Sequence, residues 1–173
     1  MQPTIELQPV AESEMAGFRE RLKAAFTKAA QEEFPGWTEV IPPDRDLDQT
    51  MDEQGVEALW FLCDGERVGG AITSGTDESR LLDFIFVDSQ QQNRHLGLAA
   101  WQAIEAHYPD VRTWELVTPY HEKRNIHFYV NRCGFHIVEY YNCRHQDPHF
   151  PQEDAGDYPG GDDGLFRFQK IRF

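Results

Sequence analysis

The sequence is poor in the features that mark secreted, membrane and metal-binding proteins. It has three cysteines, Cys63, Cys133 and Cys143, and no Cys-x-x-Cys spacing, which argues against a disulfide framework or a zinc ribbon. No apolar run approaches the roughly 18 residues that a membrane helix requires. The N-terminal stretch has no basic start followed by an apolar segment, so it indicates neither a signal peptide nor a transit peptide. We therefore expect reduced thiols and a cytoplasmic protein without a membrane partner.

Basic residues are also scarce. The chain has 16 Lys and Arg against 30 Asp and Glu, which gives a formal net charge of −14. Because binding to a phosphate backbone needs clustered positive charge, we expect no nucleic-acid partner. A surface of this charge would instead attract a cationic small molecule or a basic peptide.

The remaining composition is typical of one packed domain. The 173 residues are 40% hydrophobic and 13% aromatic, enough for one core and too few for two. No internal repeat or compositional break marks a boundary, so we expect a single domain over residues 1–173. The stretch 145–164 is dense in Pro, Gly and Asp, and we expect it to form a mobile acidic loop.

Hydrophobic spacing and turn residues predict an alternation of strands and helices around one mixed α/β sheet. We expect, in order, a strand (5–10), a helix (12–33), a loop with one short helix near Asp44 (34–55), a hairpin turning at Asp64-Gly65 (56–75), a strand (80–88), a helix (95–107), a strand (113–119), a helix (122–132) and two strands (135–145 and 165–173).

The turn at residues 92–98 has the properties of a phosphate site. A tight turn that opens a helix leaves several backbone N–H groups without intrahelical partners, and the helix dipole adds positive potential there. Gly97 has no side chain to block a ligand that approaches the backbone. Polar side chains add further donors. These donors are Gln92, Asn93, Arg94 and His95.

Residues 87–99 resemble motif A of the GNAT superfamily of N-acetyltransferases, whose pattern is Gln/Arg-x-x-Gly-x-Gly/Ala. With Gln92 as the first residue, Gly97 takes the final Gly/Ala place and His95 replaces the first glycine. We prefer this register, because the distance from Val87 to Gly97 then matches the usual length of the turn.

A second register fits the same pattern. With Arg94 as the first residue, Gly97 and Ala99 satisfy both glycine places. In the preferred register His95 opens the helix, and we expect it to do so with a negative φ.

A second block supports the resemblance. Asn125 and Tyr129, followed by Gly134-Phe135, are similar to the family's downstream helix, in which an asparagine and a tyrosine precede Gly-Phe. Because Asn125 and Tyr129 stand four residues apart, both lie on one helix face. We expect Gly134 to end this helix in a left-handed conformation.

The resemblance implies a mostly antiparallel central sheet of six to seven strands, with helices on both faces and with the fourth and fifth strands splayed. It implies that acetyl-CoA lies in the splay, with its pantetheine on the fourth strand and its pyrophosphate on the turn. The implied cofactor-binding residues are Phe86 and Val87 on the strand, Gln92, Asn93, Arg94, His95, Leu96, Gly97 and Leu98 on the turn, and Asn125 and Phe128 on the downstream helix.

The resemblance also implies direct attack of an amine on the thioester, with Tyr129 as general acid to the departing thiolate. An amine with a pKa near 10 is mostly protonated at neutral pH, so a base or a water relay is needed. Asp83, within an apolar strand, is the favoured base, because burial would raise its pKa. Glu115 and His121 are rivals, and a structural role for Asp83 is the alternative.

Other functions are less well supported. Cys143, His145 and His149 have ligand-like spacing but lack the paired arrangement of a zinc site, so we expect no metal. A Rossmann dinucleotide site would need two further glycines. The main alternative is a catalytically silent acyl-CoA-binding sensor of the same fold, which would not need Tyr129.

The acceptor is not readable from any motif. It is a small-molecule or peptide amine, and the acidity of the chain favours a cationic one. The carboxylate run Asp44 to Glu53 is the segment best suited to attract a cation. Members of the family are often dimers, so a homodimer is compatible with the resemblance.

Overall fold

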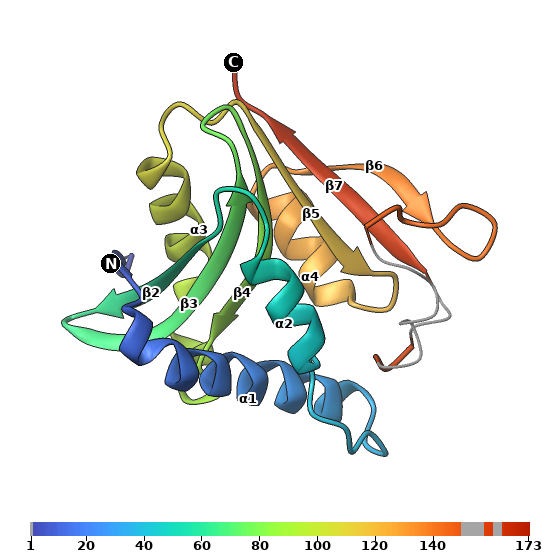
Figure 1. Cartoon of the computed structure of the whole chain (residues 1–173), viewed down its shortest axis with the longest axis horizontal. Coiled ribbons are helices and arrows are strands. Elements are labelled where there is room, and N and C mark those ends of the chain that lie inside the picture. Colours follow the sequence, from blue (N-terminus) through green and yellow to red (C-terminus); the bar gives the residue numbers. More distant parts are fainter. Residues whose placement is uncertain (1, 150–157, 161–163) are drawn as a thin grey trace.

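One twisted sheet of seven strands organises the computed structural model, which describes residues 2–149, 158–160 and 164–173 (Figure 1). The strand order is β1-β2-β3-β4-β5-β7-β6. All neighbours are antiparallel except β4 and β5, which are parallel. This confirms the expected mixed, mostly antiparallel sheet. The strands are β1 (Glu6–Pro9), β2 (Glu57–Cys63), β3 (Glu66–Gly75), β4 (Ser79–Val87), β5 (Thr113–Pro119), β6 (His136–Tyr141) and β7 (Leu165–Ile171).

Helices cover both faces of the sheet, also as expected. α1 (Met15–Glu33) and α2 (Asp44–Met51) lie on one face, and α3 (Leu96–His107) and α4 (Lys123–His127) lie on the other (Figure 1). Three short turns complete the set: η1 (Glu12–Glu14), η2 (Ser89–Arg94) and the π-helical turn η3 (Phe128–Arg132). None of the helices in the described part of the chain is both long enough and apolar enough to cross a membrane.

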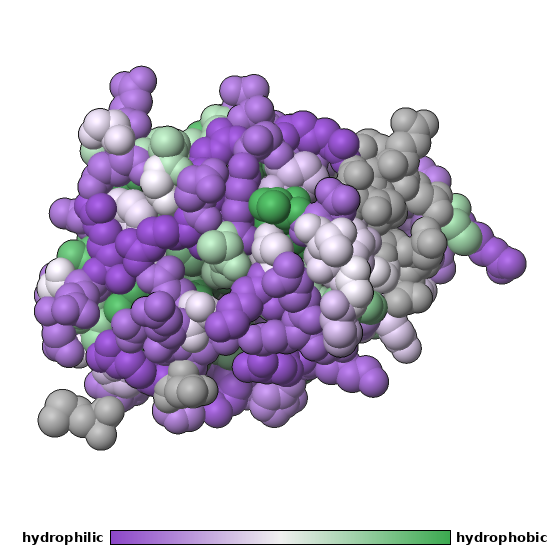
Figure 2. Space-filling model, turned by 90° about the horizontal axis from the view of Figure 1, so that it is seen from below, coloured by the Kyte–Doolittle hydropathy of each residue, from purple (hydrophilic) through white to green (hydrophobic). Residues whose placement is uncertain are grey.

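Aromatic side chains fill the core on each face of the sheet. Under α1, the ring of Phe18 meets Trp60 at 4.9 Å and Phe86 at 5.5 Å, both edge to face. Under α3, Trp101 and Trp114 meet edge to face at 5.2 Å. Each such pair contributes about 0.5–1.5 kcal/mol beyond the area that it buries. The surface on the α1 side is mostly hydrophilic, with hydrophobic residues confined to small spots (Figure 2).

The β4 and β5 strands pair only at their beginnings. Their parallel register covers Ser79 to Leu81 on β4 and Thr113 to Glu115 on β5. Beyond Leu81, β4 continues to pair with β3 up to Val87, but not with β5. The backbone edge of β4 that faces β5 is therefore open over residues 82–87, which confirms the expected splay.

Asp83 is the extra residue of a β-bulge in β4. Across the β3–β4 pair, Thr73 lies opposite Leu82 and Ile72 opposite Phe84, so Asp83 has no partner of its own. Leu82 packs into the core under α3, whereas Phe84 packs against the core under α1. Because of the bulge, the side chains of Leu82 and Phe84 lie on opposite faces of the sheet, although residues two apart in a regular strand lie on the same face. This change of face occurs at the first residues of the splay.

The last part of the chain differs from the expected outline. The predicted strand 135–145 ends at Tyr141, because Asn142 and His145 bond to each other through two backbone hydrogen bonds of 2.9 and 3.1 Å and turn the chain. Much of the predicted mobile loop, residues 150–157 and 161–163, lies outside the described residues. Within the described part, the hydroxyl of Tyr158 donates a hydrogen bond of 2.5 Å to Asp46 on α2.

The turn that follows α2 is pressed against the end of β3. Gly55 has φ +65°, and a Cβ built on it would lie 2.0 Å from the carbonyl oxygen of Gly75. The N–H of Gly75 donates to the carbonyl of Gln54 at 2.7 Å, and Arg80 Nη2 donates to the carbonyl of Gly55 at 2.7 Å. Only glycine combines this φ with this close approach.

Replacing Gly55 with alanine should lower the free energy of unfolding by roughly 1–3 kcal/mol, because the Cβ adds a collision to the cost of the left-handed backbone. Urea denaturation measures the change. Gly65→Ala is the matched control, since Gly65 has φ +81° but no atom within 4 Å of its would-be Cβ. Equal losses in the two variants would contradict the close approach.

Candidate active site

A groove of about 1530 Å³ follows the gap between β4 and β5. Its lining comes from the turn before α3, from α4 and η3, from the end of α1, from α2 and from the residues after β5. Most of the predicted site residues line it, and we list them here: Asp83, Phe86, Val87, Gln92, Arg94, His95, Leu96, Gly97, Leu98, Asn125, Phe128 and Tyr129.

Val87 can meet a ligand mainly through its backbone. The Phe86 ring is 5% exposed and packs against Phe18 in the core under α1, and Val87 packs against the opposite core. Successive residues of a strand direct their peptide groups to opposite neighbours, and the N–H of Asp88 bonds to Val68 of β3. The peptide groups of Phe86 therefore face β3, and those of Val87 belong to the open edge of β4. An extended ligand with amide groups can therefore pair with this edge as an additional strand would.

The turn before α3 forms the second part of the groove. Its 3-10 turn, η2, ends at Arg94, and α3 begins at Leu96, whose side chain is buried. The first backbone N–H groups of α3 have no intrahelical partners, and residues 95–98 line the groove. Arg94 is held at the rim by Gln91 Oε1 at 2.8 Å and by Cys63 Sγ at 3.5 Å. These groups make the turn suited to an anion.

His95 corrects the expectation of a negative φ. Its φ is +56° and its ψ +34°, in the left-handed region. Because only His95 separates the end of η2 from the start of α3, the chain must change direction within one residue. The left-handed conformation of His95 produces this change of direction. This is the place at which the preferred register of the motif puts the first glycine, so the backbone keeps the glycine conformation although the side chain is imidazole. His95 is exposed at the groove.

Gly97 lies under the ring of Phe128. A Cβ at Gly97 would be 3.4 Å from Phe128 Cζ, an ordinary contact distance. Gly97 therefore leaves room between α3 and η3, and Phe128 forms the opposite wall of the groove. Leu98, next in the helix, is half-buried.

The predicted helix 122–132 divides into α4 and the π-helical turn η3. Asn125 lies exposed on α4, and Tyr129 lies in η3 with 7% of its surface exposed. Burial raises the pKa of the Tyr129 hydroxyl, which keeps it protonated. No described residue forms a hydrogen bond with this hydroxyl. As predicted, the chain ends this segment at Gly134 with φ +84°.

Asp83 lies at the opening of the splay. Its Oδ2 is buried and has no hydrogen-bond partner in the described part of the chain. Burial raises the pKa of the Asp83 carboxyl to about 7; Glu53 adds to the rise, and Ser74 and Arg80 oppose it. A carboxyl with this pKa exchanges its proton near neutral pH.

The two rival bases differ in their surroundings. Glu115 accepts hydrogen bonds from Arg167 at 2.8 Å and Gln169 at 3.0 Å, so it is already engaged in an ion pair. His121 is 12% exposed, packs edge to face on Phe34, and leaves its buried Nδ1 without a partner among the described residues. Both line the groove.

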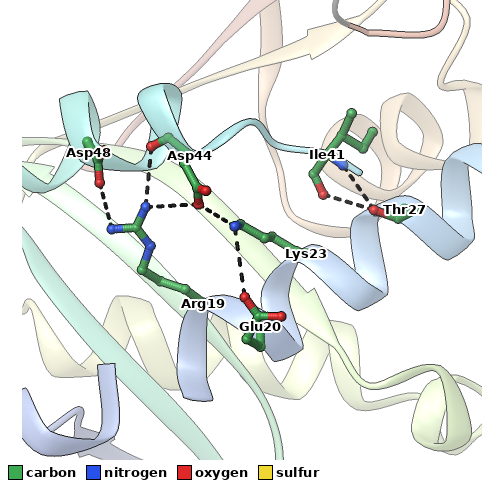
Figure 3. Close-up of polar contacts among 7 residues, drawn as sticks. All are labelled: Arg19, Glu20, Lys23, Thr27, Ile41, Asp44 and Asp48. Atoms are coloured by element: carbon green, nitrogen blue, oxygen red, sulfur yellow. Dashed lines mark hydrogen bonds and ion pairs between the residues drawn. The ribbon is translucent and has the colours of Figure 1, made fainter. Parts of the chain in front are cut away.

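The carboxylates of α2 are mostly paired with α1 (Figure 3). Arg19 binds Asp48 at 2.7 Å and Asp44 at 3.4 Å, and Lys23 also binds Asp44. Thr27 exchanges hydrogen bonds with the backbone of Ile41. The run from residue 44 to 53 is therefore not one acidic face, because two of its five carboxylates, Asp44 and Asp48, fasten α2 to α1.

Among the described residues, no three His, Cys, Asp or Glu side chains come together to hold a metal ion. His145 bonds instead to Glu139 at 2.6 Å. Within the described residues all three cysteines are free thiols, and burial raises the pKa of Cys133 to about 12.

Sequence comparison relates the chain to an acetyltransferase family and to a bacterial relative. A family model described as "Acetyltransferase (GNAT) family" matches residues 23–135. "Uncharacterized protein YrkN" of Bacillus subtilis is 43% identical over 176 residues, which cover 98% of this chain and 95% of the relative.

Solved structures share the fold at low identity. A GNAT family acetyltransferase from Elizabethkingia anophelis with acetyl-CoA bound has a TM-score of 0.68 and 14% identity, over 98% of this chain and 99% of the other. A Bacillus subtilis acetyltransferase in complex with CoA has a TM-score of 0.64 and 18% identity, over 99% and 100%. AAC(6')-Ib in complex with ribostamycin and coenzyme A has a TM-score of 0.65 and 18% identity, over 98% and 94%.

Replacing His95 with glycine should raise the free energy of unfolding by about 0.5–1 kcal/mol, because glycine adopts the left-handed conformation without a Cβ clash. Urea denaturation measures the gain. His95→Ala removes the imidazole but keeps the Cβ, so it should show no gain. If both variants behave alike, backbone strain at this position is not the cause.

Replacing Asp83 with asparagine should stabilise the protein in a pH-dependent way. The folded-state pKa near 7 lies above the unfolded value near 3.9, so the wild type loses stability as the pH rises from about 4 through about 7. We expect Asp83→Asn to exceed the wild type by about 1–3 kcal/mol at pH 8 and by much less at pH 4. Denaturation across this range checks it, with the exposed Asp52→Asn as control; a difference that does not vary with pH would contradict the raised pKa.

Proposed function

The chain belongs to the acetyltransferase (GNAT) family, and we propose that it transfers the acetyl group of acetyl-CoA to a primary amine by direct attack. The observation that carries this proposal is the meeting of three features in one groove: the open edge of β4, the amide-rich turn before α3, and the Asp83 carboxyl, whose buried Oδ2 has no hydrogen-bond partner among the described residues. The first two suit coenzyme A, and the third suits proton removal from an amine.

The residues of the groove fit coenzyme A. The backbone of Val87 on the open edge of β4 offers hydrogen bonds to the amides of the pantetheine arm, and the N–H groups of residues 95–98 offer them to the pyrophosphate. Arg94 adds a positive charge at the rim, and Asn125 adds a polar side chain on the opposite wall. When bound, acetyl-CoA supplies an acetyl group activated as a thioester.

The chain's own residues supply the proton transfers. Asp83 accepts the proton that the attacking ammonium must lose, directly or through water. The amine nitrogen then forms the new bond to the acetyl carbon, and the carbon–sulfur bond breaks. The hydroxyl of Tyr129, which burial keeps protonated, donates its proton to the departing sulfur. Each transfer of this kind contributes roughly 10²–10⁴ in rate.

The carboxylates of the groove favour a cationic acceptor. Glu33, Glu53 and Asp83 line it, and none of them makes an ion pair with a described Lys or Arg. Unpaired carboxylates in a groove attract and orient an ammonium group. That AAC(6')-Ib is seen in complex with ribostamycin and coenzyme A agrees with a fold that accepts such an acceptor together with the coenzyme. A cytoplasmic location and a homodimer remain predictions.

An assay of thiol release tests the proposal. The protein with acetyl-CoA is given a panel of primary amines: spermidine, ribostamycin, lysine and a peptide with a free N-terminus. We expect release with at least one cationic amine, and a loss of roughly 100-fold or more in kcat for Tyr129→Phe with little change in the calorimetric affinity for coenzyme A. Tyr120→Phe, an exposed tyrosine outside the groove, is the matched control.

The outcomes separate the alternatives. Binding of coenzyme A without release from any amine would favour a silent sensor. Equal losses of turnover and affinity in Tyr129→Phe would remove its role as a proton donor. No binding at millimolar coenzyme A would overturn the proposed cofactor site.

A further inference from the structure

Two arginines of the groove have no partner in the described part of the chain. Arg124 lies on α4 and Arg132 in η3; both are exposed, line the groove, and form no hydrogen bond or ion pair with described residues. Three further arginines line the groove, and other residues engage each of them. They are Arg80, which bonds to Thr73 and Gly55, Arg167, which pairs with Glu115 and Glu139, and Arg94, which bonds to Gln91 and Cys63.

Two segments on facing sides of the groove contain no acidic residue. Residues 89–104 include the turn before α3, and residues 123–138 include α4 and η3; neither has an Asp or Glu, in a chain that has 30 of them. The two segments meet where Phe128 Cζ lies 3.4 Å from the position of a Cβ on Gly97. Because a net charge of −14 repels anions, a region with bases and without acids is where a polyanion can bind.

α4 and η3 lead alongside α3 in the same direction. Phe128 meets Gly97, in the first turn of α3. Beyond η3, a Cβ on Gly134 would lie 3.5 Å from Lys170 Cε, and Lys170 pairs at 2.8 Å with Glu105, in the last turn of α3. The chain from Phe128 to Gly134 therefore runs from the start of α3 towards its end.

This direction separates the two unpaired arginines. Arg124 stands four residues before Phe128, on the same helix face and about 6 Å earlier along the axis. It therefore lies towards the turn that precedes α3, whereas Arg132 lies further along α3. The acid nearest to Arg124 in sequence is Glu122, whose carboxylate lies 3.8 Å from His121. Arg124 is thus a free cation on the side of the groove that faces the turn.

Coenzyme A carries one charged group that the turn does not account for. Its pyrophosphate suits the N–H groups of residues 95–98 and the neighbouring Arg94. Its 3′-phosphate is a monoester with about −1.5 to −2 charges at neutral pH, and a single ribose joins it to the pyrophosphate. A base that binds this group must lie close to the turn and be free to pair. Arg124 meets both conditions, and its planar guanidinium suits phosphate oxygens.

We infer that Arg124 is a specificity-determining residue that binds the 3′-phosphate of coenzyme A, so that the protein prefers coenzyme A to its 3′-dephospho form. The inference rests on the proposed function and names one contact of the proposed cofactor site. The same contact offsets the repulsion between the coenzyme phosphates and a strongly acidic protein.

Titration calorimetry with two ligands tests this without any acceptor. Coenzyme A and 3′-dephospho-coenzyme A differ only in the 3′-phosphate, so the ratio of their affinities reports on that group. We expect the wild type to bind coenzyme A roughly 10-fold or more tightly than the dephospho form. Arg124→Gln should reduce the ratio to about 1–3 by weakening the binding of coenzyme A alone.

Two variants are matched controls. Lys123→Gln removes one positive charge from the adjacent exposed residue, which does not line the groove. Arg132→Gln removes one from the other unpaired arginine of the groove. Both should keep the wild-type ratio. Because all of these side chains are exposed, the variants should fold, and circular dichroism checks this.

The outcomes separate this inference from the proposed function. A ratio that falls in Arg124→Gln alone supports the inference. If the wild type binds both ligands equally, if Arg124→Gln loses affinity equally for both, or if a control lowers the ratio as much, the inference is overturned while the proposed cofactor site stands. If the wild type binds neither ligand at millimolar concentration, the cofactor site is wrong and the inference falls with it.

Discussion

The limited parallel pairing between β4 and β5 is the constraint from which the site follows. Three residue pairs hold the two strands together, and then they separate. Two parallel neighbours need a crossover connection, and here α3 makes it. The helix must start near the far end of β4, so its free amides come to the same place as the unpaired edge of that strand. The connection from β4 through α3 to β5 thus places the unpaired strand edge next to the N-terminus of α3. The edge can bind amide groups, and the helix N-terminus can bind an anion.

Ion pairing divides the many carboxylates of this chain into two groups. Those that fasten elements together, such as Asp44 on α2 and Glu115 on β5, meet arginine or lysine side chains. Glu33, Glu53 and Asp83, which line the groove, form no ion pair with a described Lys or Arg. Glu33 and Glu53 are exposed, whereas Oδ2 of Asp83 is buried without a hydrogen-bond partner among the described residues. A poorly solvated charge without a partner is unfavourable, so the Asp83 carboxyl agrees with a site that receives a positive group from outside. The net charge of −14 does not reveal this division by itself.

Hydrophobic spacing was sufficient to predict all seven strands and the long helices, because their patterns are local. The features that shape the site are not local. The bulge at Asp83 depends on the register between β3 and β4, and the partners of the α2 carboxylates come from Arg19 and Lys23, more than twenty residues away. The left-handed His95 could have been anticipated, since the motif places glycine there, but the side chain alone suggested an ordinary helix start. The π-helical turn at Tyr129 had no signal in the spacing.

The open edge of β4 has a consequence for how this fold diverges. A strand that recognises a ligand by its peptide groups leaves both rows of its side chains free to pack inside, as Phe86 and Val87 do. Mutations can therefore change those side chains, within the volume that the core allows, without removing the backbone groups that would pair with the ligand. Proteins sharing only 14–18% of their residues with this one can retain such an open strand edge. It is more readily recognised by comparing backbone structures than by aligning sequences.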